Sequence, residues 1–142
     1  MRSKKLIPHL RKNSRLSLAQ LSKELEVPTS TMYEWLKQIE NRFVIKHTTL
    51  FDFKKLGFQQ ISINLKVQKH QQQSLQQKLL RFPELNRLYT TTGMFDLVAE
   101  FYVQDFQRIT ELQEMLSKAD GVQKSSMQHI IKEIEKERFF SQ

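Results

Sequence analysis

The N-terminal fold is decided by residues 17–43, which read SLAQLSKELEVPTSTMYEWLKQIENRF. Ser17 and Gln20 have the Ser-x-x-Gln spacing of a capping box, in which both side chains satisfy backbone donors that are otherwise unpaired where a helix begins. Apolar residues follow at helical spacing, at Leu18, Leu21 and Leu25. The residues between them are mostly polar, so the pattern predicts an amphipathic helix that begins at Ser17.

A second helix is expected after the interruption at Glu26, Val27 and Pro28. Proline lacks an amide donor and disfavours helical backbone in the residue before it, so the first helix ends within these three residues. Proline also suits the first turn of a new helix. Four apolar residues form the inner stripe of that helix, with Trp35 beside them: Met32, Leu36, Ile39 and Phe43. The opposite face collects polar side chains: Ser30, Tyr33, Glu34, Lys37 and Asn41.

Two short helices joined by a turn of about three or four residues are the arrangement that reads DNA in a helix-turn-helix. Early side chains of the second helix meet base edges in the major groove, and nearby basic groups hold phosphates. The candidate base-reading residues are Thr29, Ser30, Thr31, Tyr33, Glu34 and Lys37. A generic three-helix bundle with a solvated polar face is the alternative.

Elements on both sides extend this unit. Upstream, apolar residues at helical spacing predict a helix over residues 3–12, in which Pro8 imposes a late start or a bend. Downstream, residues 44–51 are rich in β-branched and aromatic side chains, which predicts a strand or short hairpin that forms a wing. The candidate contacts to the DNA backbone are Arg42, Lys46 and His47.

Basic residues are concentrated in the N-terminal part of the chain, which has a net charge of +8 over 142 residues. Residues 1–57 hold 12 Lys and Arg against 5 Asp and Glu (+7), whereas residues 58–142 hold 11 against 10 (+1). This asymmetry favours a polyanion as the partner of the first segment and a protein or small molecule as the partner of the second. A basic surface that serves solubility alone is the alternative.

Composition also excludes several classes of site. The chain has no cysteine, so it contains no disulfide, thiolate catalyst, zinc finger or iron–sulfur ligand set. The first 12 residues lack an apolar core of signal-peptide length, and no run of about 18 apolar residues occurs. We therefore expect a cytoplasmic protein without a metal or cofactor.

Residues 58–142 predict a second, α+β domain. Apolar and polar residues alternate from Ile61 to Val67, the pattern of a strand buried on one face. The expected order is strand 58–67, helix 71–82, strands 85–92 and 95–103, a helix that Asp105 caps and Gly121 ends, and strand 122–131. Phe106 begins the apolar stripe of that second helix.

This βαββαβ order is ferredoxin-like: a four-stranded antiparallel sheet with both helices on one face. Val98 and Tyr102 lie on the other face of the expected sheet. A dimer that packs sheet against sheet would bury these side chains.

Four stretches resemble the Lrp/AsnC family of leucine-responsive and feast/famine regulators across nearly the whole chain. They are NSRLSLAQL at residues 13–21, Asp52-x-x-x-Leu56-Gly57, Thr92-Gly93-Met94-Phe95-Asp96, and Gly121-Val122. The resemblance implies a winged helix-turn-helix DNA-binding domain, here residues 1–57, followed by a ferredoxin-like effector-binding and dimerisation domain, here residues 58–142. It further implies homodimers that assemble into tetramers or octamers, and in many members control by an amino-acid effector.

The resemblance places the effector region at the turn that contains Thr92, Gly93 and Asp96. Gly93 permits an unusual backbone angle and Asp96 can attract an amino group, although ordinary turn chemistry explains both residues as well. Three residues depart from the family pattern. Glu26 stands where the family usually has Gly, and Pro28 and Met127 stand where it often has Ser and Thr.

Three other functions are weighed against a sequence-specific regulator. Siroheme decarboxylases resemble this family, but their His-Asn-Tyr-x-Arg stretch is absent and the histidines at 9, 47, 70 and 129 fall in different predicted elements. We therefore expect no enzyme, because catalysis needs a clustered acid or base. A DNA-architectural protein with little sequence preference and a ligand-sensing module without DNA binding remain open.

Overall fold

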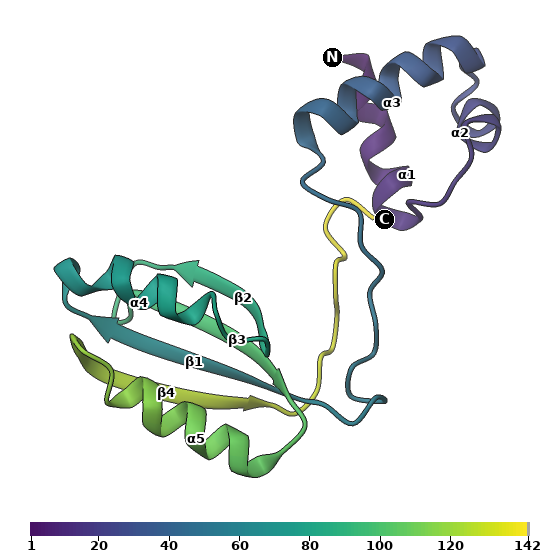
Figure 1. Cartoon of the computed structure of the whole chain (residues 1–142). Helices are drawn as coiled ribbons and strands as arrows, with labels where there is room; N and C mark the ends of the chain where they lie inside the picture. The colour runs from purple at the N-terminus through teal and green to yellow at the C-terminus, as the bar shows by residue number, and fades with distance from the viewer. Residues whose placement is uncertain (142) are drawn as a thin grey trace. The chain divides into compact units, whose positions relative to one another are not determined.

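The computed structural model describes residues 1–141 and divides into two compact units (Figure 1). The helix-turn-helix unit comprises Met1–Leu50 and residues 134–141, and the sheet unit comprises Phe51–Glu133. The chain thus enters the sheet unit before the boundary expected at Gly57, and it returns to the first unit for its last described residues. Residue 142, the end of the expected second domain, lies outside the described residues.

The helix-turn-helix unit is built from short helices around a small apolar core. A 3₁₀ helix, Arg2–Leu6, leads into α1 (Ile7–Lys12), followed by α2 (Leu18–Leu25) and α3 (Thr29–Phe43). Pro8 stands in the first turn of α1, where its missing amide breaks no helical hydrogen bond, so the expected late start of this helix is confirmed. The buried core residues are Leu6, Leu21, Met32 and Ile39.

Two expectations for the end of this unit are wrong. Residues 44–51 form no strand or hairpin in the described chain, so the predicted wing is not formed by these residues. Their β-branched side chains favour extended backbone, but a strand also needs a neighbour for its backbone groups, and Ile45 is 97% exposed. Phe43 continues the apolar stripe of α3 in sequence, yet it is 49% exposed because it lies at the last residue of the helix.

The sheet unit confirms the α+β, ferredoxin-like βαββαβ expectation. Its elements are β1 (Gln59–Val67), the 3₁₀ turn Lys69–Gln71, α4 (Gln72–Leu79), β2 (Leu85–Thr90), β3 (Leu97–Val103), α5 (Phe106–Ser117) and β4 (Val122–Ile130). The strand order is β2-β3-β1-β4, and every neighbouring pair is antiparallel. Asp105 caps α5 as expected, because its carboxylate accepts a hydrogen bond from the Gln107 amide at 2.9 Å.

Helices α4 and α5 both cover one face of this sheet (Figure 1). Alternate residues of the central strands β1 and β3 are buried against them, including Ile63 and Phe101. On the opposite face Val98 and Tyr102 are half-buried, and the ring centroid of Phe53 lies 4.7 Å from that of Tyr102. The apolar stripe of α5 does not bury Phe106, which is 67% exposed because it is the first residue of the helix.

Candidate nucleic-acid interface and effector region

The capping box that opens α2 is present. Ser17 Oγ accepts a hydrogen bond from the backbone amide of Gln20 at 3.2 Å, and Gln20 Oε1 accepts one from the backbone amide of Ser17 at 2.8 Å. These two bonds define where α2 begins, because they satisfy donors that the helix itself leaves unpaired. The start of the helix-turn-helix is therefore set locally by sequence.

The turn between α2 and α3 adopts the left-handed backbone that the family pattern would assign to glycine. Glu26 has a φ of 53°, which costs a residue with a side chain about 1 kcal/mol relative to glycine. Ser22 stabilises the turn: its carbonyl accepts from the Val27 amide at 3.1 Å, and its hydroxyl donates to the Val27 carbonyl. Thr29 Oγ1 lies 3.5 Å from the same hydroxyl. Ser22 is not among the predicted site residues, since a polar residue on a helix face gives no signal of this role.

Helix α3 separates its two faces clearly. Met32 and Ile39 are buried in the core, whereas Ser30, Glu34 and Lys37 are exposed and Tyr33 is 52% exposed. These four exposed side chains belong to the predicted reading set. Of the other two members, Thr29 is exposed beside Ser22 and Thr31 is half-buried.

The residues predicted to contact the DNA backbone are all exposed. Arg42 donates to the sulfur of Met1 at 3.8 Å, and His47 Nε2 lies 3.7 Å from Glu40 Oε1. Lys46 lies after α3, in the stretch of residues 44–51 that forms neither helix nor strand. Because residues 1–50 hold 10 Lys and Arg against 4 Asp and Glu, these groups stand in a basic unit. Its positive potential suits an anionic partner.

A side-chain hydrogen bond joins α1 to α2 in the same unit. His9 Nδ1 lies 2.8 Å from Glu24 Oε2, with both side chains partly exposed. Sequence reasoning missed this contact, because two residues 15 positions apart carry no local pattern. The pair adds a tertiary link between helices whose shared core is small.

The predicted effector region is a turn tightly bonded to β1. Gly93 has a φ of 99°, the unusual angle that its sequence position suggested, and Thr92 is exposed. Asp96 is half-buried, and its carboxylate oxygen Oδ2 accepts a hydrogen bond from the Val67 amide at 2.8 Å. The Asp96 amide donates to the Leu65 carbonyl at 2.9 Å. One oxygen of this carboxylate is therefore engaged in holding the turn against β1.

An open hollow lies beside this turn. Asp96 lines it, whereas Thr92 and Gly93 are not part of the lining. The other lining side chains come from the end of β1, the segment after it and the start of β4, among them Lys66, Gln68, His70, Gln72 and Gln123. Sequence reasoning missed these residues, since their only common feature is that the fold brings them together.

An ion pair that shifts the pKa of both its partners lies outside the predicted DNA-binding and effector regions. Arg108 Nε on α5 donates to Glu84 Oε1 at 2.7 Å. Burial opposes the ionisation of Glu84, but the hydrogen bond and charge of Arg108 outweigh it, so the pKa of Glu84 is lowered. The hydrogen bond to Glu84 in turn raises the pKa of Arg108. This pair ties the start of β2 to α5 and is structural.

No helix within residues 1–141 has the length and apolar character needed to cross a membrane. The same residues contain no group of three or more His, Asp or Glu side chains placed to hold a metal ion.

The sheet unit matches a known family. The family described as the Lrp/AsnC ligand binding domain matches residues 60–139, more than half of the chain. The chain belongs to the Lrp/AsnC family. This membership confirms the resemblance that the sequence motifs indicated. The turn at residues 92–96 and Gly121-Val122 lie within the matched residues.

Relatives that match most of this Lrp/AsnC chain are named as transcriptional regulators. The HTH-type transcriptional regulator FL11 of Pyrococcus furiosus is 27% identical over 131 residues, which cover 91% of this chain and 87% of that protein. An uncharacterized HTH-type transcriptional regulator of Pyrococcus abyssi is 27% identical over 138 residues, covering 96% and 93%. The prediction of a transcriptional regulator rather than an enzyme agrees with these relatives.

Solved structures support the fold of this Lrp/AsnC chain. The L-Met complex of a transcriptional regulator from Neisseria meningitidis has a TM-score of 0.85 at 22% identity, covering 94% of this chain and 90% of that one. AsnC of Escherichia coli has a TM-score of 0.82 at 16% identity, covering 94% and 93%. At these identities the likeness concerns the fold.

Proposed function

We propose that this Lrp/AsnC chain is a sequence-specific DNA-binding transcriptional regulator that reads the major groove with the exposed face of α3. The observation that carries this proposal is the division of α3 into a buried face and an exposed polar face, directly after a helix-turn-helix turn, in a basic unit. A groove-reading helix needs an inner face that fixes it and an outer face with donors and acceptors for base edges. Its base-reading residues are Thr29, Ser30, Thr31, Tyr33, Glu34 and Lys37, with Arg42, Lys46 and His47 on the DNA backbone.

A regulator of this kind gains affinity for DNA when two copies of its helix-turn-helix unit bind together. We infer that the half-buried side chains on the open face of the sheet, among them Val98 and Tyr102, pack against a second copy to form a homodimer. Dimers then assemble into tetramers or octamers, as the family resemblance implies. A dimer presents two copies of α3 to two half-sites, which multiplies the affinity of one short helix.

The effector of this regulator is proposed to be an amino acid bound at the turn of Thr92, Gly93 and Asp96. The hollow beside that turn supports this, because it offers a carboxylate from Asp96 and cationic or amide groups from Lys66 and Gln72, which suit the two charges of an amino acid. The Neisseria meningitidis regulator with the same fold was solved with L-Met.

Base readout is tested by measuring the affinities of Lys37→Ala and Tyr33→Ala for a panel of DNA sequences. Each good base contact contributes about 1 to 3 kcal/mol of discrimination, so either variant should lose preference for one sequence. Lys23→Ala is the matched control, because Lys23 is exposed on α2 and lies outside the proposed reading set. If all three variants weaken binding uniformly, the chain binds DNA through phosphates as an architectural protein. If wild type gives no complex even at low salt, the chain senses ligands without binding DNA.

The effector proposal is tested by calorimetric titration of wild type and Asp96→Asn with individual amino acids. The new side chain keeps an oxygen that can accept the Val67 hydrogen bond, so the turn should stay in place while one charge is removed. We expect L-methionine or another amino acid to bind wild type and to bind the variant at least tenfold more weakly, by about 1.4 kcal/mol. Equal binding by both proteins would remove Asp96 from the site.

A further inference from the structure

The last described residues of the chain belong to the helix-turn-helix unit rather than to the sheet unit that precedes them. After β4 the chain leaves the sheet unit at Glu133, and residues 134–141, called here the C-terminal segment, cluster with the first 50 residues. The helix-turn-helix unit is thus joined to the rest of the chain at two points in sequence.

Arg11 on α1 binds the C-terminal segment with its guanidinium group. Its Nε donates to the Phe139 carbonyl at 3.0 Å, and its Nη2 donates to the Glu137 carbonyl at 3.0 Å. The same nitrogen forms an ion pair with Glu137 Oε2 at 2.9 Å. A guanidinium presents rigidly placed donors, so three acceptors around one arginine define a specific seat for the segment.

The C-terminal segment has a well-defined conformation. Glu137 and Phe140 have φ values of 54° and 59°, a left-handed backbone that residues with side chains adopt only where surrounding contacts hold them. The Arg138 carbonyl accepts from both the amide and the hydroxyl of Ser141, at 3.0 and 2.7 Å. The turn is therefore closed by its own hydrogen bonds as well as by Arg11.

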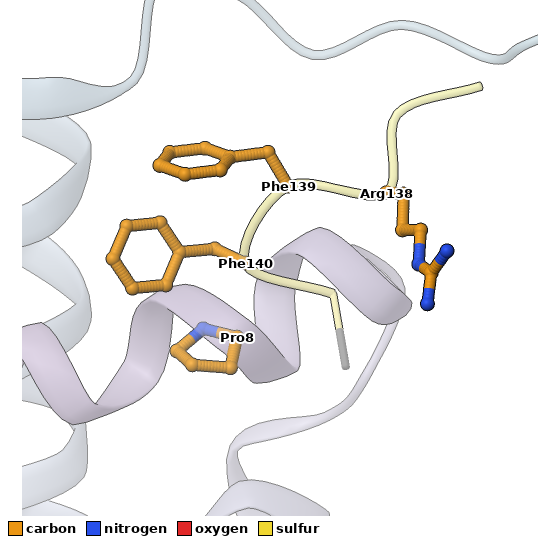
Figure 2. A pocket seen from close by; sticks show the side chains of 4 residues that line it. All are labelled: Pro8, Arg138, Phe139 and Phe140. Atoms are coloured by element: carbon orange, nitrogen blue, oxygen red, sulfur yellow. The ribbon is translucent and has the colours of Figure 1, made fainter. Parts of the chain in front are cut away.

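Two aromatic rings of the segment lie over α1. Phe139 and Phe140 pack edge to face with ring centroids 4.7 Å apart, and both line a shallow pocket with Pro8 (Figure 2). Figure 2 shows the Phe140 ring above the Pro8 ring, while the Arg138 side chain points away from both. Apolar contact at Pro8 and polar contact at Arg11 thus come from neighbouring turns of one helix.

We propose that the face of α1 formed by Pro8 and Arg11 is a docking site for the chain's own C-terminal segment. We call the docked segment a clasp. It holds the end of the chain on the helix-turn-helix unit, so that this unit is connected to the sheet unit through residue 134 as well as through residue 50. An undocked clasp leaves that unit connected to the sheet unit at residue 50 alone. The docked state depends on Arg11, because this one side chain bonds to both Glu137 and Phe139.

Trypsin cleavage of the Arg138–Phe139 bond in the full-length protein tests this proposal. Cleavage requires an extended, accessible backbone, so its rate follows the population of the undocked clasp. A synthetic peptide of residues 132–142 provides the rate for the unprotected bond, and mass spectrometry identifies the product. We expect wild type to be cut at least tenfold more slowly than the peptide.

Variants at both ends of the contact sharpen the test. Arg11→Ala should speed cleavage about tenfold towards the peptide rate, because it removes three charge-assisted bonds at once. Glu137→Ala, compared with a peptide carrying the same change, should give a smaller increase because the two carbonyl acceptors remain. The double variant should be cut no faster than Arg11→Ala, and Arg15→Ala, which changes an exposed arginine after α1, should match wild type.

Three results would overturn the proposal. The first is cleavage of wild type as fast as the peptide. The second is an unchanged cleavage rate in an Arg11→Ala protein whose circular dichroism and melting curve match wild type. The third is protection that disappears on dilution, which would place the segment on a second copy instead of its own chain. None of these readouts involves DNA, so the clasp stands or falls separately from the proposed function.

Discussion

The two units differ in how much apolar material holds them together. Four apolar residues are buried in the core of the helix-turn-helix unit, against 13 in the core of the sheet unit. The smaller unit is correspondingly more dependent on individual contacts, including the capping box at Ser17, the His9–Glu24 hydrogen bond and the bonds of Arg11. This difference suits a regulator, because modest changes in contacts can alter the helix-turn-helix unit without unfolding the well-packed sheet unit.

The largest expected effect comes from the same change made in each core. Leu112→Ala and Leu21→Ala each delete a fully buried side chain and should cost about 2 to 5 kcal/mol. The sheet unit should stay folded in Leu112→Ala, whereas in Leu21→Ala the helix-turn-helix unit should unfold while the sheet unit stays folded. Trp35, the single tryptophan, lies in α3 and reports on the smaller unit by fluorescence, while hydrogen exchange of the strands reports on the larger. Simultaneous unfolding of both units in Leu21→Ala would contradict the contrast.

Glycine substitutions should produce the next largest effect, within the sheet unit. Gly121 has a φ of 83°, and an added Cβ would lie 2.5 Å from the Cβ of Gln71. Gly93 has a φ of 99° but open space around it, so it is the matched control. Gly93→Ala should cost about 1 kcal/mol from backbone strain alone, and Gly121→Ala clearly more, about 2 to 4 kcal/mol. Urea unfolding measures both, and equal losses would show that the close approach to Gln71 relaxes freely.

Removal of the capping box should affect only the smaller unit. Ser17→Ala leaves the Gln20 amide without its partner and should cost about 1 kcal/mol. Unfolding followed by Trp35 fluorescence should shift, while strand exchange in the sheet unit should not. Ser117→Ala, at the end of α5, is the comparison variant, because its hydroxyl donates to a carbonyl of its own helix. A larger loss in Ser117→Ala would contradict the importance of the cap.

The smallest expected effect is a pH dependence confined to the sheet unit. Since the folded pKa of Glu84 is lowered, the pair with Arg108 stabilises the fold at pH values above the ordinary carboxyl pKa. That stability is lost as pH falls through the lowered pKa of Glu84. Urea midpoints measured from pH 7 to pH 3 should therefore fall less steeply in Glu84→Gln than in Glu114→Gln, an exposed carboxylate change on α5. Parallel curves for the two variants would contradict this role.

Most of the fold could be predicted because it follows local patterns. The capping box indicated the start of α2, the period-2 alternation located β1 and β3, and the apolar stripe located α3. The contact between the C-terminal segment and Arg11 was not predictable in this way, because Arg11 and Phe139 lie 128 positions apart in the sequence. For the same reason the hollow beside Asp96, assembled from separate segments, gave no signal in the sequence.

The errors have a common physical origin. Residues 44–51 have strand-forming composition, but pairing depends on a neighbour that composition cannot specify. Phe43 and Phe106 fit apolar periodicity, yet both stand at helix ends, where the stripe runs past the edge of the core. Periodicity thus identified elements and their inner faces, while exposure at their ends was set by tertiary packing.

The central claim is that the exposed face of α3 selects a DNA sequence. Selection of bound fragments from random double-stranded DNA, with the full-length protein in parallel with Lys37→Ala, tests this most directly. We expect wild type to enrich one motif with two related half-sites, and the variant to enrich a motif relaxed at one position in each half-site. Enrichment of no motif by wild type, or of an identical motif by both proteins, would contradict the claim.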